Sequence, residues 1–205
     1  MLQAQFRGST GFGEAWRLAG YRQWGLRMQD DVTDGVKAMI DQGIADATRV
    51  CIVGASYGGY AALAGAAFTP DLYRCAVSVN GVSDLPQMLT YEKNHAGAES
   101  DTPAYWREHI GSGFDPQVIA RSPLRAASQI KAPVMLMHAV NDTVVPQSQS
   151  EAMSRELDTL KKKVTYVRLP GEDHWLSQSP TRIRMLEELQ KFLAEQLRPA
   201  AAGAP

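Results

Sequence analysis

A serine between glycines is the residue of this sequence with the most evident chemistry. Ser56 stands in the run GASYG (residues 54–58), directly after an apolar stretch and directly before an alanine-rich one. On a tight strand-to-helix turn of this kind, the hydroxyl is exposed at the edge of a sheet and can attack a carbonyl. Such a turn needs small neighbours, which Gly54, Gly58 and Gly59 provide. We therefore expect Ser56 to be a nucleophile; the alternative is an ordinary helix N-cap serine.

A serine hydroxyl is a weak nucleophile without a base, and the chain offers an acid and a histidine after Ser56. Asp142 follows one apolar run and His174 follows the next, each beyond the end of an expected strand. The order serine, acid, histidine is the order of α/β-hydrolases. Taken singly, Asp142 could be a turn residue and His174 a solvated loop residue. Together they predict a Ser56–His174–Asp142 triad.

The elements that must position these residues follow from the hydrophobic pattern. Expected strands are Met1–Phe6, Arg49–Val53, Ala76–Val79, Pro133–Ala139 and Val164–Leu169, and expected helices are a stretch over residues 32–40 that stops at Gly43, then Gly58–Phe68, Gln147–Leu160 and Pro180–Leu197. Strands that are apolar throughout and alternate with helices predict an α/β fold, with a parallel sheet covered on both faces. Residues 85–127 read as an excursion over the carboxyl ends of the strands, where ligands bind.

Composition limits the classes of function. The chain has 205 residues, of which 44% are hydrophobic and 21% charged, with a formal net charge of −1. This favours one globular domain over residues 1–198, followed by a disordered tail over 199–205. We expect no nucleic-acid partner, because a basic excess is lacking, and no membrane span, because the apolar runs are short. The spacing of histidines and cysteines predicts no metal site. His95 and His109 have no acid or nucleophile motif beside them, and we expect His138, at a strand end, to be a structural hydrogen-bonding residue.

Two cysteines occur, Cys51 and Cys75, each inside an apolar run. We expect them to be buried reduced thiols in core strands. A disulfide is the less favoured alternative, although neighbouring strands could bring them together. The first residues, Met1–Phe6, lack the basic and apolar regions of a secretory leader, so we expect a cytoplasmic protein.

Four segments together resemble the prolyl oligopeptidase family of serine peptidases. They are the nucleophile segment Asp46–Tyr60, the loop Phe6–Gly13, the acid loop Asp142–Pro146 and the histidine loop Gly171–His174. The resemblance covers nearly the whole chain and is nearest to the acylaminoacyl-peptidase-like and dipeptidyl-peptidase-like branches. It implies an α/β-hydrolase fold that cleaves short peptides or acyl-peptides through an acyl-enzyme. A serine triad needs no cofactor, and none is expected.

The resemblance assigns roles to single residues. Ser56 would be the nucleophile, His174 the general acid and base, and Asp142 its orienting partner, with the backbone N–H of Tyr57 as one oxyanion donor.

Substrate-binding positions follow from the same resemblance. Val82, Leu85 and Met88 match the region that lines the first specificity pocket, where the aliphatic Leu85 and Met88 argue against proline specificity. Val144 stands where several relatives carry an Arg or Asn that holds the substrate backbone.

The chain also departs from the family pattern. It has no segment for the N-terminal β-propeller, nor for the strands and the second oxyanion donor that precede the part matching Met1–Phe6. We therefore expect an N-terminally truncated domain, with the missing propeller segment or a second copy of the chain as its partner. Two other hypotheses stay open. One is an inactive fragment that acts only by association, and the other is a small carboxylesterase or thioesterase.

Overall fold

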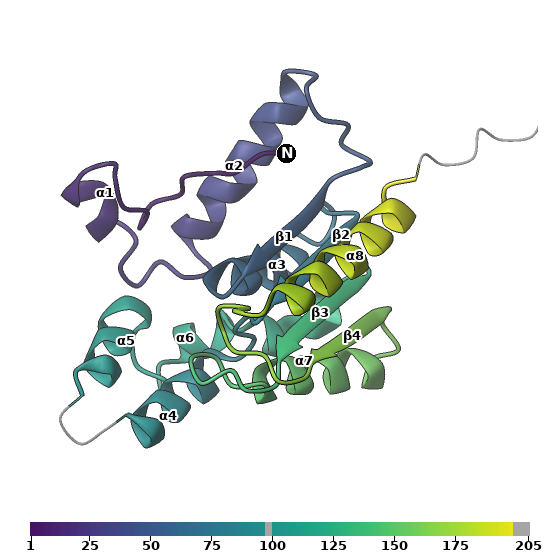
Figure 1. The fold of residues 1–205 in the computed structure, drawn as a ribbon. Coiled ribbons are helices and arrows are strands. Elements are labelled where there is room, and N and C mark those ends of the chain that lie inside the picture. The colour runs from purple at the N-terminus through teal and green to yellow at the C-terminus, as the bar shows by residue number, and fades with distance from the viewer. Residues whose placement is uncertain (97–99, 199–205) are drawn as a thin grey trace, which may run out of the picture.

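A four-stranded parallel sheet forms the centre of the protein (Figure 1). The computed structural model describes residues 1–96 and 100–198. The strands are β1 (Cys51–Ala55), β2 (Cys75–Val79), β3 (Val134–Ala139) and β4 (Val164–Leu169), paired in that order. The α/β class is confirmed, and four of the five expected strands are found within two residues of their expected bounds. The expected tail over 199–205 lies outside the described residues.

Helices cover both faces of the sheet, as predicted. Helices α3 (Tyr57–Phe68) and α7 (Ser148–Thr159) pack on one face, and α8 (Ser179–Gln196) packs on the other. Alternation along β2 divides its side chains between the two sides. Ala76 packs in the cluster that contains Leu63 of α3, whereas Val77 packs in the cluster that contains Phe192 of α8. Two apolar layers therefore hold the sheet.

The remaining helices lie beside the sheet, α1 and α2 in the upper left of Figure 1 and α4, α5 and α6 in the lower left. Their bounds are α1 (Glu14–Leu18), α2 (Arg27–Asp41), α4 (Leu85–His95), α5 (Thr102–Ile110) and α6 (Pro116–Ala120), with a 3₁₀ helix η1 (Pro123–Gln129) after them. The expected excursion over residues 85–127 is thus largely helical. A third apolar cluster, which includes Trp24, Tyr60 and Ile110, joins α2, α4, α5 and α6 to α3.

The prediction of a strand at Met1–Phe6 is wrong. This segment has no regular secondary structure and runs beside α2. Arg7, directly after it, binds Asp31 of α2 through its main-chain N–H and two guanidinium nitrogens, at 2.6–2.9 Å. A strand needs a partner strand for its backbone groups. Within the described residues, this segment has a helix as its neighbour instead.

The prediction that Cys51 and Cys75 are reduced thiols is also wrong. The two residues form a disulfide. They stand directly opposite each other in the β1–β2 pair, with their Cα atoms 4.6 Å apart, which lies within the range that a disulfide bridges. The sequence placed both in strands but did not give the register. Disulfides are rare in cytosolic proteins, so this one gives the expected cytoplasmic location no support. That location stays a prediction.

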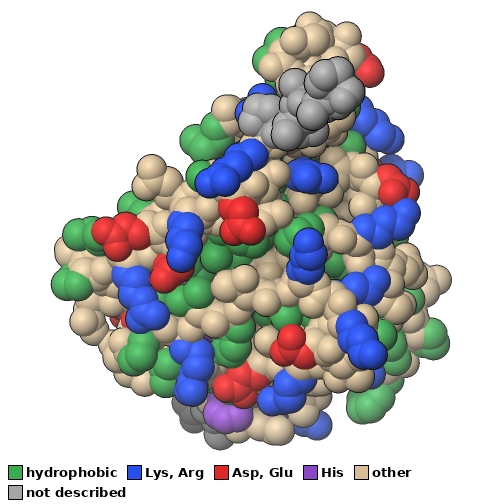
Figure 2. All heavy atoms as spheres, turned by 90° about the vertical axis from the view of Figure 1, so that its right-hand side faces the viewer, with side chains coloured by type: hydrophobic (Ala, Val, Ile, Leu, Met, Phe, Trp, Pro, Cys, Tyr) green, Lys and Arg blue, Asp and Glu red, His purple; other side chains and the backbone are tan. Residues whose placement is uncertain are grey.

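The surface is mixed in charge. Figure 2 shows basic and acidic side chains interspersed over the face turned toward its viewer, in keeping with the net charge of −1. No helix within residues 1–96 and 100–198 has both the length and the apolar character that crossing a membrane requires.

Candidate active site

Ser56 sits on the turn between β1 and α3 in a backbone conformation that side chains rarely adopt. Its φ is 56° and its ψ is −119°, which is the strained geometry of a nucleophile on a strand-to-helix turn. The turn is held from both sides. The Ser56 N–H donates to the carbonyl of Val79 at 2.9 Å, and the Ser56 carbonyl accepts from the N–H of Tyr60 at 3.1 Å. An ordinary N-cap serine is extended, so this alternative does not fit.

The glycines around the turn differ in what they do. A Cβ on Gly54 would overlap the carbonyl group of Gly58, and a Cβ on Gly59 would lie 2.7 Å from the Cα of Gly81. Both positions therefore require glycine. A Cβ on Gly58 would meet nothing within 4 Å. The expectation that all three glycines are needed is correct for Gly54 and Gly59 and wrong for Gly58.

The three residues of the predicted triad lie together. The Oγ of Ser56 is 3.0 Å from Nε2 of His174, and Nδ1 of His174 is 2.7 Å from Oδ2 of Asp142. The carboxylate accepts, so Nδ1 carries the ring proton and Nε2 is left to accept from the serine hydroxyl. The Asp142 side chain is fully buried and that of His174 is 5% exposed. This is the arrangement that activates a serine hydroxyl.

The acid is held by its own loop. The other carboxylate oxygen of Asp142, Oδ1, accepts from the N–H groups of Val144 and Val145 at 2.9 and 2.8 Å. Hydrogen bonds from two N–H groups to one carboxylate oxygen fix the direction of the carboxylate. One oxygen is thus anchored by the backbone, and the other is left for His174.

A second histidine lies against this acid. His138 is fully buried, with Nε2 2.9 Å from the carbonyl of Val145 and 3.6 Å from Oδ2 of Asp142, and Nδ1 2.7 Å from Oγ of Ser150. Both neighbours of Nε2 are acceptors, so Nε2 carries the proton and Nδ1 accepts from the serine hydroxyl. Burial lowers the pKa of His138 and favours this neutral form. Through its contacts with Val145 and Asp142, His138 helps to hold the acid loop in place.

The histidine loop is fixed by two buried polar residues. Asn80, 2% exposed, donates from Nδ2 to the carbonyl of His174 at 3.0 Å. Glu172 is fully buried and accepts from the N–H groups of Asp173 and Gln178. Sequence reasoning missed both residues. For Asn80 the available indication was a polar residue directly after the apolar β2 segment, at the edge where the triad was expected.

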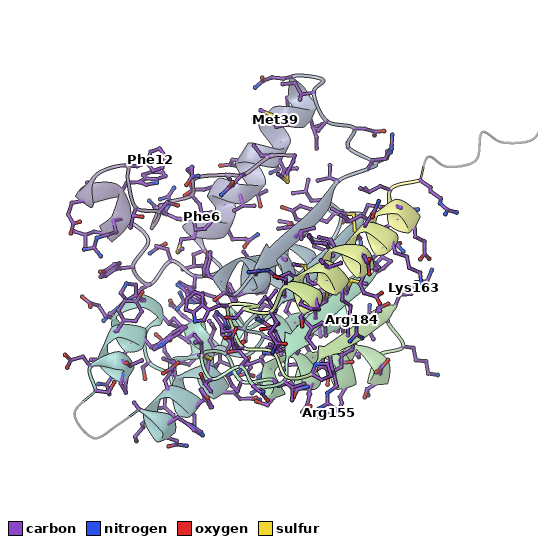
Figure 3. The ribbon with its side chains drawn as sticks, in the orientation of Figure 1. Phe6, Phe12, Met39, Arg155, Lys163 and Arg184 are labelled. Atoms are coloured by element: carbon purple, nitrogen blue, oxygen red, sulfur yellow. A yellow bond between two sulfur atoms is a disulfide. The ribbon has the colours of Figure 1, made fainter. Side chains whose placement is uncertain are left out.

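An aromatic pocket of about 430 Å³ adjoins Ser56. Its lining includes Phe6, Trp24, Tyr57 and Trp106. The Tyr57 ring centroid lies 5.2 Å from that of Phe6 and 4.5 Å from that of Trp24, and Figure 3 shows Phe6 on the N-terminal segment that precedes α1. Burial raises the pKa of the Tyr57 hydroxyl, so this ring stays uncharged. An apolar or aromatic side chain fits such a lining.

Comparisons with known proteins agree with this geometry. Residues 1–200 match the Prolyl oligopeptidase family. The chain belongs to this family. The resemblance to this family of serine peptidases is thereby confirmed.

Individual relatives extend the match. The chain is 35% identical to dipeptidyl aminopeptidase BIII of Pseudoxanthomonas mexicana over 95% of its own length and 28% of that protein. A puromycin-hydrolyzing peptidase of Mycobacterium tuberculosis superposes with a TM-score of 0.86 at 35% identity, over 97% of this chain and 30% of that one. An acylaminoacyl peptidase in complex with Z-Gly-Gly-Phe-chloromethyl ketone gives a TM-score of 0.83 at 25% identity, over 97% and 32%. The α/β-hydrolase fold is confirmed, and the chain spans less than a third of these relatives.

Three of the four residues predicted to bind substrate in this prolyl oligopeptidase-family chain lie off the pocket surface. Val82 lines the pocket, whereas Leu85 and Met88 are fully buried behind it in the cluster that contains Val82. Val144 is half-buried and packs against the same cluster without lining the pocket. Helix α4 turns Leu85 and Met88 inward, so the lining comes instead from Trp24 and other aromatic residues. The prediction missed these because they are distant along the chain.

Tyr57 occupies the position expected for an oxyanion donor. It is the first residue of α3, and a backbone N–H in the first turn of a helix has no acceptor within that helix. This N–H follows the nucleophile directly, as the donor in the strand-to-helix turn of hydrolases does.

Proposed function

We propose that this chain carries the catalytic site of a serine peptidase that cleaves short peptides or acyl-peptides. The observation that carries the proposal is the 3.0 Å approach of Ser56 Oγ to His174 Nε2, with the other ring nitrogen 2.7 Å from Asp142. Ser56, His174 and Asp142 act as nucleophile, general base and orienting acid. No metal or cofactor has a part in the proposed reaction.

Acylation begins when the Ser56 hydroxyl gives its proton to Nε2 of His174 and Oγ attacks the substrate carbonyl. The resulting oxyanion accepts a hydrogen bond from the N–H of Tyr57. His174, now doubly protonated and stabilised by Asp142, gives the proton to the leaving nitrogen, and the carbon–nitrogen bond breaks. Water then loses a proton to His174 and attacks the ester. His174 gives this proton to Oγ of Ser56 as the carbon–oxygen bond breaks, which releases the acid and restores Ser56.

The pocket defines the preferred acyl side chain. The rings of Trp24, Tyr57 and Trp106 line it, and aromatic walls bind apolar and aromatic groups through burial and edge-to-face contacts. We propose a preference for an aromatic residue at the bond that is cut. The acylaminoacyl peptidase bound to Z-Gly-Gly-Phe-chloromethyl ketone supports this. The relatives' length supports a further segment in the parent protein, such as the expected propeller.

Fluorophosphonate labelling tests the proposal, because this reagent reacts with activated serines. We expect mass spectrometry to place the label on Ser56, and labelling to be lost in His174→Ala and strongly slowed in Asp142→Asn. The matched controls are Ser128→Ala and His95→Ala, both at exposed positions, which should label like wild type. A folded chain that is not labelled contradicts the proposal and favours a silent domain that acts by association. Labelling together with cleavage of esters but not peptide amides favours the carboxylesterase alternative.

A further inference from the structure

The pocket beside Ser56 has a polar wall that the proposed triad does not use. Its lining includes Arg17 of α1, Tyr21 just after α1, and Tyr105 and His109 of α5. These two helices are far apart in sequence. The wall therefore exists because the fold brings α1 and α5 to the same cavity.

Arg17 is held in place by three of its five N–H groups. Nε and Nη2 donate to the carboxylate of Glu14 at 2.9 and 2.6 Å, and Nη1 donates to the hydroxyl of Tyr21 at 2.6 Å. The guanidinium also lies 5.4 Å from the centre of the Tyr21 ring. Within the part of the chain that the structure describes, two N–H groups of Arg17 remain for a ligand. A guanidinium keeps its charge at every physiological pH.

A stack of rings supports this arrangement from the side of α5. The His109 ring lies 4.2 Å from the Tyr21 ring and 3.9 Å from the Tyr105 ring, between centroids. Nδ1 of His109 donates to the carbonyl of Tyr105 at 2.8 Å, and the N–H of Arg22 donates to the carbonyl of His109 at 2.7 Å. These contacts join the segment that follows α1 to α5, and they hold Tyr21, the hydrogen-bond partner of Arg17, so Arg17 is oriented before any ligand arrives.

The lining presents the guanidinium of Arg17, whose ion-pair partner Glu14 lies outside the lining. The side chain of Glu14 is largely exposed, at 66%. No carboxylate is found in the lining among the described residues. A free α-ammonium group would find no carboxylate in this lining to accept its hydrogen bonds, whereas a carbonyl oxygen would find two N–H donors of Arg17. Donors with a full charge make the stronger hydrogen bonds to such an oxygen.

We propose that Arg17 binds the carbonyl oxygen of the group that precedes the aromatic residue of the substrate. The site thereby prefers substrates whose amino end is acylated over substrates with a free α-amino group at that residue. This inference rests on the proposed function, because it assumes that Ser56 attacks the carbonyl of the residue in the aromatic pocket. Arg17 then acts as a specificity residue on the acyl side of the bond that is cut.

Two matched fluorogenic amides test this role. They are N-acetyl-phenylalanine and phenylalanine with a free amino group, each joined to the same aminocoumarin. We expect wild type to show the higher kcat/KM for the acetylated compound. Arg17→Gln should lower the ratio of the two kcat/KM values by about tenfold or more, since a charged donor is lost on one substrate only. Arg27→Gln, at an exposed arginine, is the control and should leave the ratio unchanged.

Fluorophosphonate labelling separates the two possible failures. Labelling of Ser56 at the wild-type rate in Arg17→Gln shows that the triad is intact in the variant. A ratio that stays unchanged in that labelled variant overturns the role of Arg17 and leaves the proposed function standing. A wild-type chain that prefers the substrate with the free amino group also overturns the role of Arg17 and leaves the proposed function standing. A wild-type chain that is folded and not labelled counts against the proposed function itself.

Discussion

The side chain of Asn80 donates a hydrogen bond over 3.0 Å to the main-chain carbonyl of His174. Its oxygen accepts from the N–H of Ala139 at 2.8 Å, so one amide joins the ends of β2 and β3 to the histidine loop. Asn80 is 2% exposed and has a φ of 49°, a left-handed conformation that asparagine tolerates better than most residues. The position of His174 therefore depends on a residue outside the triad.

Removal of this side chain should slow the reaction of Ser56. Asn80→Gly keeps the left-handed backbone without strain but releases the His174 loop, and a misplaced base costs on the order of 10²-fold in rate. Asn80→Asp should be slowed as well, because a carboxylate cannot donate to the His174 carbonyl. The rate of fluorophosphonate labelling measures both. Asn94→Gly, at an exposed position of α4, controls for the substitution. A rate in Asn80→Gly within twofold of wild type would contradict this role.

Gly54 and Gly58 give a matched pair at the nucleophile turn. In Gly54→Ala the new methyl overlaps the carbonyl group of Gly58, so we expect a loss of stability of about 1–3 kcal/mol and little labelling of Ser56. In Gly58→Ala the methyl meets nothing within 4 Å. Since alanine favours a helix over glycine by about 0.5–1 kcal/mol, this variant should be at least as stable as wild type. Urea unfolding and the rate of fluorophosphonate labelling distinguish the two variants. Equal stability and equal labelling of Gly54→Ala and Gly58→Ala would show that the turn has room for a methyl group at residue 54.

The disulfide between Cys51 and Cys75 should stabilise the protein through the loop that it closes. The two residues are separated by 24 positions, and a loop of this length corresponds to about 3.5 kcal/mol of unfolding free energy in the chain-entropy description. We expect reductant to lower the midpoint of urea unfolding in wild type. It should have no effect on a Cys51→Ala, Cys75→Ala double variant. Two reactive thiols in the denatured, unreduced protein would disprove the disulfide.

The sequence and the structure agree where the controlling interactions are local. The stretch Val164–Leu169 forms its strand with the bounds that were expected, because β-branched and aromatic residues such as Val164 and Tyr166 favour strands. The ends of the same strands carry Ser56, Asp142 and His174, and parallel strands bring their carboxyl ends to one edge. A local pattern together with one topological rule was therefore enough to predict this cluster.

Features that depend on pairing between distant segments were not predictable in the same way. The disulfide depends on the register that sets Cys51 against Cys75, and hydrophobicity does not encode register when a strand is apolar throughout. The pocket wall depends on Trp24 and Trp106, whose ring centroids lie 5.9 Å apart although more than 80 residues separate them. Each contact is a property of the packed fold and has no local pattern.

The buried His138 should make stability depend on pH in a defined window. Burial lowers its pKa in the folded protein, whereas in the unfolded chain it takes up a proton near pH 6.5. As the pH falls through about 6.5, the unfolded state gains a proton that the folded state lacks. The unfolding free energy therefore decreases, by at most about 1.4 kcal/mol per pH unit, until the pH reaches the folded pKa. Above pH 6.5 the contribution of His138 to stability is fully present.

Urea unfolding between pH 7.5 and 5 measures this contribution, and His138→Gln should have a shallower pH dependence than wild type whatever its overall stability. Asp31 does not interfere, since hydrogen bonds from Arg7 lower its pKa and it titrates below this window. His95→Gln is the control, because His95 lies at an exposed position of α4 and its loss should leave the slope as it is. Equal slopes in wild type and His138→Gln would mean that His138 takes up its proton in the folded protein as readily as in the unfolded chain. In that case the neutral ring could not be part of the support beneath Asp142.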